Sequence, residues 1–234
     1  MGKSWKKAGM MAKSQAKGAQ FTKLAREIQV AAKLGGPDPE SNSRLRMAVD
    51  AAKAVSCPKD TIERAIKKGS GQLDGGIIEE AIYEGYAPHQ VAIIVECQTD
   101  NKNRTATDIR TIFNKCGGSL GEMGSVAWMF DRVSLVSGKP PENMKDPEEE
   151  AIEAGANEVE EGSNEGDFDF YGAMEDLDKI RTALTERGWQ ITAAEPSYKA
   201  KTLAEVSEEG LKEVHEFLQK LEDTDDSHRV YANI

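Results

Sequence analysis

Apolar residues in the first third of the chain recur at the spacing of α-helices. The first stripe consists of Phe21, Leu24, Ala25, Ile28 and Ala32. These positions fall on one side of a helix, which Gly35-Gly36-Pro37 ends. The same spacing predicts a second helix from about Ser43 and a third with Pro58 in its first turn. The lysine-rich residues 1–17 are typical of a flexible arm ahead of these helices.

Beyond residue 75 the pattern changes to short β-branched runs that alternate with helical stripes. Strands are predicted at 91–97 and 125–131, with a helix between them at 104–116. From residue 133 six elements follow in the order β-α-β-β-α-β, which is the split ferredoxin-like arrangement. They are expected at 133–137, from Asp146, and at 157–161, 167–171, 176–187 and 189–194.

The last segment predicts a strand near 199–206, a helix that Ser207 caps, and a strand at 228–233. Combined with the elements of 91–131, these complete a second β-α-β-β-α-β unit, into which the first is inserted. The predicted fold class is therefore α+β with three domains. They are a basic three-helix domain with its arm (1–75), a discontinuous ferredoxin-like α+β domain (76–132 and 197–234), and an inserted acidic ferredoxin-like α+β domain (133–196).

Charge is distributed unevenly between these parts. Residues 1–75 hold 15 Lys and Arg against 7 Asp and Glu, whereas residues 76–234 hold 15 against 34. The first segment therefore carries a net charge of +8 within a chain of net charge −11. A basic segment attached to an acidic body indicates a polyanionic partner, most simply nucleic acid.

The residues predicted to contact phosphates are the lysines and arginines of this segment. In the arm they are Lys3, Lys6, Lys7, Lys13 and Lys17. In the helices they are Lys23, Arg26, Lys33, Arg44, Arg46, Lys53, Lys59, Arg64, Lys67 and Lys68. Such contacts position a protein on nucleic acid and carry little base specificity.

Other candidate chemistry is weaker. The glycines of 117–124 lack the Lys-Ser or Lys-Thr of a phosphate-binding P-loop, so they indicate turns. The run at 125–131 lacks an RNA-recognition pattern, so Trp128 and Phe130 are expected in a core. The stretch 142–178 holds 15 acids, of which Asp167 and Asp169 are expected on the solvent-facing side of a strand. No catalytic residue, metal site or cofactor is predicted.

Composition also bears on the cellular compartment of the protein. The three cysteines, Cys57, Cys97 and Cys116, fit neither a disulfide framework nor a zinc knuckle, which favours a reducing compartment. The apolar runs are shorter than the roughly 20 residues of a membrane span. A cytoplasmic location without a membrane partner is therefore expected, and no small-molecule substrate is evident.

Several longer motifs resemble one known family. The segment 21–71, YEGYAP (83–88), TDNKNRT (99–105) and FNKCGGSLGEMGSVAWMF (113–130) are similar to the YebC/PmpR family. The resemblance covers most of the chain and is strongest over 21–131. Where members often have Gly-Pro-Gly-Gly, this chain has Ala87-Pro88-His89-Gln90, and its N-terminus lacks the family's usual His.

The resemblance implies three domains, no enzymatic activity and no cofactor. Members of the family are described as DNA-binding transcriptional regulators or as ribosome-associated translation factors. The first hypothesis is therefore a nonenzymatic DNA-binding transcriptional regulator. The alternative is a translation factor that binds ribosomal RNA, and a ligand-sensing regulator is the third.

Overall fold

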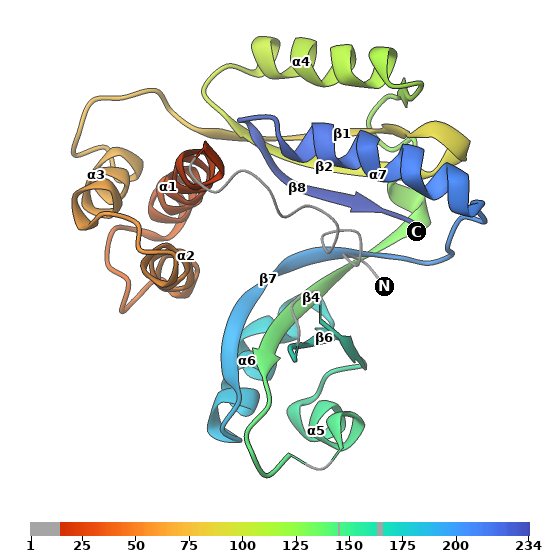
Figure 1. Cartoon of the computed structure of the whole chain (residues 1–234). Helices are drawn as coiled ribbons and strands as arrows, with labels where there is room; N and C mark the ends of the chain where they lie inside the picture. Colours follow the sequence, from red (N-terminus) through yellow and green to blue (C-terminus); the bar gives the residue numbers. More distant parts are fainter. Residues whose placement is uncertain (1–14, 145, 163–165) are drawn as a thin grey trace. The chain divides into compact units, whose positions relative to one another are not determined.

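The computed structural model describes residues 15–144, 146–162 and 166–234 (Figure 1). The described chain divides into two compact units. The main unit comprises 15–129 and 202–234, and the insert unit comprises 130–201. The boundaries of three domains at residues 76, 133 and 197 stay a prediction.

Three helices open the main unit, and Figure 1 shows them grouped together: α1 (Gln15–Gly35), α2 (Ser43–Ala54) and α3 (Lys59–Gly69). Their apolar stripes form one core, in which Ile28, Leu45 and Ala52 are completely buried. Asn42 caps α2 by accepting the N–H of Leu45 at 3.0 Å. Its amide also donates to the Ala31 carbonyl at 2.8 Å, so one side chain joins α1 to α2.

The sheet of the main unit has the antiparallel strand order β3-β1-β2-β8. Its elements are β1 (Glu79–Tyr86), β2 (Ala92–Thr99), α4 (Lys102–Lys115), β3 (Ser119–Leu120), α7 (Glu208–Glu222) and β8 (Ser227–Ala232). The helices α4 and α7 pack together through Phe113 and Phe217, whose rings meet edge to face at 5.0 Å. Ser207 caps α7 as predicted, because its hydroxyl accepts the N–H of Gly210 at 3.2 Å.

Two strand predictions in this unit are wrong. Residues 125–131 form a short 3-10 helix (Ala127–Met129) that leads into the next strand, and residues 203–206 lie in no strand. The sheet contains β1 instead, a strand that the sequence pattern did not indicate. β1 pairs with β2 along its whole length, so pairing rather than local pattern makes it a strand.

The insert unit has the antiparallel order β5-β6-β4-β7, which is the order of a ferredoxin-like sheet. Its elements are β4 (Phe130–Lys139), α5 (Pro147–Ala154), β5 (Glu158–Glu161), β6 (Phe168–Gly172), the 3-10 turn Met174–Asp176, α6 (Leu177–Glu186) and β7 (Gln190–Ala200). Its core places Phe170 and Trp189 edge to face at 4.8 Å. The fold class is therefore α+β, as the sequence predicted. The insert unit has the predicted β-α-β-β-α-β order, whereas the sheet and helices of the main unit follow the order β-β-α-β-α-β instead of the predicted one.

Two features of the insert unit differ from the sequence predictions. First, β7 runs through Pro196 to Ala200 as one strand, because it pairs with the long strand β4. Second, Asp167 and Asp169 are only 3% and 7% exposed, so the prediction of a solvent-facing side is wrong. Each of these carboxylates accepts a hydrogen bond from a hydroxyl group: Ser137 donates to Asp169 and Thr192 donates to Asp167.

Candidate nucleic-acid interface

The structure describes only part of the predicted phosphate-binding set. Lys3, Lys6, Lys7 and Lys13 lie outside the described residues, and Lys17 is described only as backbone of α1. The other ten cations lie on α1, α2 and α3. Their surroundings separate them into residues held by internal contacts and residues free to meet a ligand.

The cations of α1 are held by the rest of the main unit. Arg26 lies 2.9 Å from Asp226 and also donates to the carbonyl of Asp225. Lys23 donates to the carbonyl of Glu222, and Lys33 donates to the carbonyl of Ile78 at 3.3 Å. Each of these cations therefore spends part of its donor capacity on an internal partner, and Arg26 is also paired with a carboxylate.

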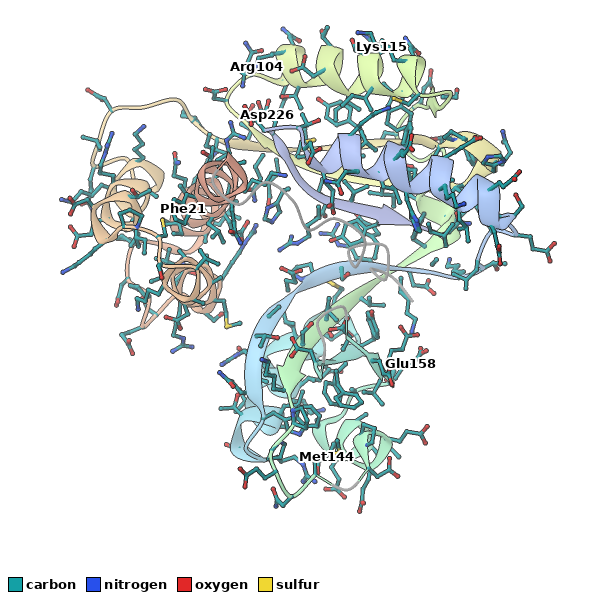
Figure 2. All side chains as sticks on the ribbon, viewed as in Figure 1. Phe21, Arg104, Lys115, Met144, Glu158 and Asp226 are labelled. Carbon is teal, nitrogen blue, oxygen red and sulfur yellow. The ribbon has the colours of Figure 1, made fainter. Side chains whose placement is uncertain are left out.

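Asp226 is the centre of the contact made by Arg26. Its carboxylate accepts the hydroxyl of Thr105 at 2.6 Å and that of Thr99 at 3.0 Å. Arg104 lies 3.3 Å away, and Figure 2 shows the two labelled side chains close together. Burial raises the pKa of Asp226, but hydrogen bonding by Thr105 and the charge of Arg26 outweigh it and lower the pKa overall.

Arg44 belongs to a second, partly buried cluster. Its guanidinium lies 2.8 Å from Glu27 and 2.8 Å from Glu80. Glu27 also accepts the amide of Gln98 and lies 3.2 Å from His228. These contacts join α1 and α2 to strands β1, β2 and β8, so Arg44 acts as internal structure.

The electrostatics of this cluster strongly favour the charged carboxylate. Burial raises the pKa of Glu27, but the hydrogen bond from Arg44 and the charges of His228, Arg44 and Arg229 outweigh it, so the pKa falls to about 2. Burial lowers the pKa of Arg44, and its bonds to Glu27 and Glu80 raise it above its ordinary value. The Glu27 and Arg44 side chains are therefore ionised throughout the physiological range.

Three cations on α3 form what we call the α3 row: Arg64, Lys67 and Lys68. Arg64 and Lys67 are exposed, and Lys68 is half-buried. Their spacing places them on one side of the helix, away from the buried Ile62 and Ala65. None of the three has an ion-pair partner among the described residues, so their charges remain available to a ligand.

The remaining three cations give weaker evidence of a surface that binds phosphates. Lys53 and Lys59 form exposed pairs with Asp50 and Glu63 at 3.2 and 3.6 Å, and such pairs are weak. Arg46 is half-buried on α2 without an ion-pair partner in the described ranges. The structure thus brings together the α3 row and directs the cations of α1, together with Arg44, into internal contacts.

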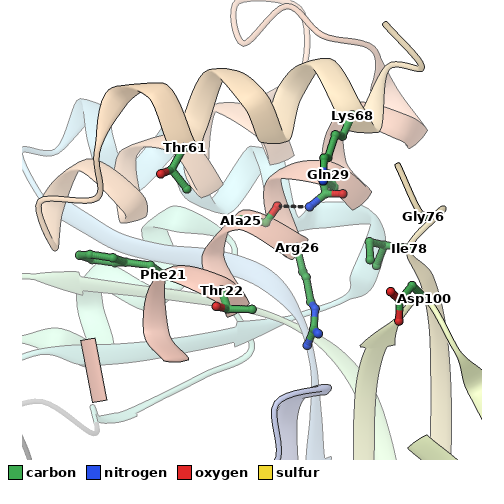
Figure 3. A pocket seen from close by; sticks show the side chains of 10 residues that line it. All are labelled: Phe21, Thr22, Ala25, Arg26, Gln29, Thr61, Lys68, Gly76, Ile78 and Asp100. Atoms are coloured by element: carbon green, nitrogen blue, oxygen red, sulfur yellow. Dashed lines mark hydrogen bonds between the residues drawn. The ribbon is translucent and has the colours of Figure 1, made fainter. Parts of the chain in front are cut away.

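A pocket of about 280 Å³ lies beside the α3 row (Figure 3). Its walls are α1, α3 and the segment that leads into β1, all within the main unit. It is lined by Phe21, Thr22, Ala25, Arg26, Gln29, Thr61, Lys68, Gly76, Ile78 and Asp100. No sequence signal pointed to it, because its residues become neighbours only when the helices pack.

The loop 121–129 is a second feature that the sequence did not reveal. The buried carboxylate of Glu84 accepts the backbone N–H groups of Gly124, Val126 and Ala127 at 2.8 to 2.9 Å. These bonds hold residues 125–129 out of a strand and leave Trp128 66% exposed. The prediction that Trp128 lies in a core is wrong, whereas Phe130 is buried as predicted. The residue that could have revealed this loop is Glu84, the acid within YEGYAP (83–88).

None of the helices in the described ranges has the length and apolar character needed to cross a bilayer. Within those same ranges, no cluster of His, Cys, Asp and Glu could hold a metal ion.

Comparison with known proteins finds family models that match nearly the whole chain. Residues 2–72 match the family model for the TACO1/YebC protein N-terminal domain, and residues 78–234 match that for the TACO1/YebC second and third domain. The "Probable transcriptional regulatory protein Bd1964" of Bdellovibrio bacteriovorus is 63% identical over the full length of both chains. A probable transcriptional regulatory protein of Polaromonas is 45% identical over 100% of this chain and 99% of its own.

A solved structure agrees with these relatives. The crystal structure of the conserved hypothetical protein Aq1575 from Aquifex aeolicus is 42% identical, with a TM-score of 0.86, and the match covers 94% of this chain and 90% of that one. The chain therefore belongs to the TACO1/YebC family, and its relatives bear the names of transcriptional regulators.

Proposed function

We propose that this protein is a nonenzymatic regulator of gene expression that binds nucleic acid through the α3 row. The observation that supports the proposal is the division among its cations. Arg26 and Arg44 are neutralised by buried carboxylates, whereas Arg64, Lys67 and Lys68 keep uncompensated charge on one side of α3. Cations near the end of a helix also complement its dipole, but that effect does not require three of them.

The proposal is tested by measuring affinity against salt concentration. The double variant R64Q/K67Q removes two charges from the α3 row, and K115Q/K212Q removes two exposed charges elsewhere in the main unit. Fluorescence anisotropy with a labelled DNA duplex should show roughly tenfold weaker binding for R64Q/K67Q and a log–log salt slope smaller by about 1.8. The control variant should bind like the wild type. Equal slopes for R64Q/K67Q and the wild type would refute the role of the α3 row.

Within this proposal, the first candidate is a DNA-binding transcriptional regulator, which the names of the relatives support. The alternative is a factor that binds ribosomal RNA. Promoter occupancy in cells and co-sedimentation with ribosomes separate the two. Enrichment at promoters would support the first candidate, and sedimentation with ribosomes without promoter enrichment would reverse the order.

A further inference from the structure

The pocket beside the α3 row exists because glycines allow close packing around it. A Cβ atom on Gly69 would lie 2.3 Å from the carbonyl oxygen of Gln29, so only glycine lets the end of α3 approach α1 this closely. Past the turn, a Cβ on Gly75 would lie 3.1 Å from the Lys68 side chain, and one on Gly76 would lie 3.2 Å from Asp100. The chain therefore passes near both residues and forms the third wall.

The lining of the pocket combines an aromatic side chain, hydroxyl groups, two cations and one carboxylate; Arg26, one of the cations, is paired with Asp226, and the carboxylate is that of Asp100. Phe21 lies at one end and Lys68 toward the other, as Figure 3 shows. Phe21 is partly buried against the helical core, which fixes its place. A ring at one end and an ammonium group at the other are the groups that bind a base and a phosphate.

The polar groups between these ends keep unused hydrogen-bonding capacity. Gln29 donates its Nε2 to the carbonyl of Ala25 at 3.3 Å, which leaves its carbonyl oxygen as an acceptor. Thr61 presents a hydroxyl from α3 on the opposite wall. An acceptor facing a hydroxyl suits a ligand that carries both donors and acceptors, such as a ribose or the edge of a base.

We propose that this pocket receives one unpaired nucleotide of an RNA chain, with its base toward Phe21 and its phosphate toward Lys68. The inference rests on the proposed function in its RNA-binding alternative, and it shares a residue with that function because Lys68 belongs both to the α3 row and to the pocket. The α3 row holds the backbone, and the pocket takes the adjoining base. A volume of about 280 Å³ is small for a ligand site but adequate for a single nucleoside.

The geometry favours an unpaired nucleotide over a duplex. A paired base would reach the pocket only by breaking its base pair and leaving its stack, which costs free energy. Bases in RNA loops and bulges are already splayed out and free to stack on protein side chains. The acceptor of Gln29 and the hydroxyl of Thr61 also supply partners for the 2′-hydroxyl, which DNA lacks.

The test compares three labelled probes: an RNA hairpin with an unpaired loop, a fully paired RNA duplex and the DNA form of the hairpin. The pocket variant is Q29A/T61V, which removes the acceptor and the hydroxyl and keeps helix-compatible residues. Its matched control is Q219A/T107V, which makes the same changes on α7 and α4. Thermal unfolding of each variant verifies that the fold is retained.

We expect Q29A/T61V to weaken binding of the RNA hairpin about tenfold, from the loss of two hydrogen bonds. Its affinity for the RNA duplex and its salt slope should stay unchanged, whereas K67Q should reduce the salt slope for every probe. The control variant should behave like the wild type.

Each contrary outcome has one meaning. If Q29A/T61V leaves the affinity for the RNA hairpin unchanged, the pocket proposal is overturned. The same holds if the variant weakens binding of hairpin and duplex equally. Both results leave the proposed function intact. Equally tight binding of the DNA hairpin would overturn the assignment to RNA. Failure of all three probes to bind the wild-type protein would instead overturn the proposed function.

Discussion

Replacing Glu27 with Gln tests the contact between the helices and the sheet of the main unit. Glu27 is 8% exposed and lies among Arg44, Gln98 and His228. Glutamine has nearly the same shape, so E27Q removes the charge and leaves the packing almost unchanged. The variant also leaves Arg44 with a single carboxylate partner, Glu80.

The pKa of Glu27 gives the size of the effect. It falls from 4.5 to about 2 on folding, and each pH unit corresponds to about 1.4 kcal/mol, so the native state favours the carboxylate by about 3 kcal/mol. Because the folded pKa lies below the unfolded one, this stability is present above the unfolded pKa and is lost as the pH falls toward 2. At pH 3 about half of it remains.

Urea unfolding at pH 7, 5, 4 and 3 measures this contribution. We expect E27Q to unfold with a free energy about 3 kcal/mol below that of the wild type at pH 7, and the difference to narrow to about 1.5 kcal/mol at pH 3. The control is E63Q, which breaks the exposed pair with Lys59 and should cost less than about 0.5 kcal/mol. A loss below about 1 kcal/mol at pH 7, or a difference that is constant from pH 5 to pH 3, would refute the reasoning.

Four further substitutions test local features by the same unfolding measurement. G69A should destabilise the protein by about 2 kcal/mol or more, because the new methyl group would meet the Gln29 carbonyl, and wild-type stability would contradict that contact. E84Q should cost about 2 to 3 kcal/mol, because its amide N–H₂ would face backbone donors, and a neutral result would show that the loop does not depend on the carboxylate. W128A should change stability by less than about 0.5 kcal/mol, since the ring is 66% exposed, and a larger loss would mean that the ring is packed. Q90G should stabilise by about 0.5 kcal/mol, because Gln90 has a φ of 60°, and destabilisation would show that its backbone is unstrained.

Much of the helical structure could be predicted because its signals are local. The stripes of α1, α2 and α3 predicted which residues are buried, and Ser207 marked the start of α7. Helical periodicity and capping depend on neighbours within a few positions, so sequence alone expresses them. The positive φ angles of His89 and Gln90, 63° and 60°, were not predicted from the sequence.

The strand errors arose where distant pairing overrides local pattern. The segment 125–131 is rich in apolar residues, yet Glu84 binds the N–H groups of Val126 and Ala127 that a strand would need. β1 has an acid-rich, irregular pattern and becomes a strand through its partner β2. Asp167 and Asp169 alternate as a surface strand would, but hydroxyl groups from β4 and β7 allow their burial.

The sequence by itself determined the family, the α+β class and the concentration of positive charge in the first 75 residues, because composition, motifs and helical periodicity belong to the chain alone. The tertiary structure decided which of those charges remain available. Arg26 and Arg44 were indistinguishable in sequence from Arg64 and Lys67, and packing placed buried carboxylates beside the first pair only. The reason is physical: a cation is neutralised by whichever anion lies within a few ångströms of it, and folding sets that distance.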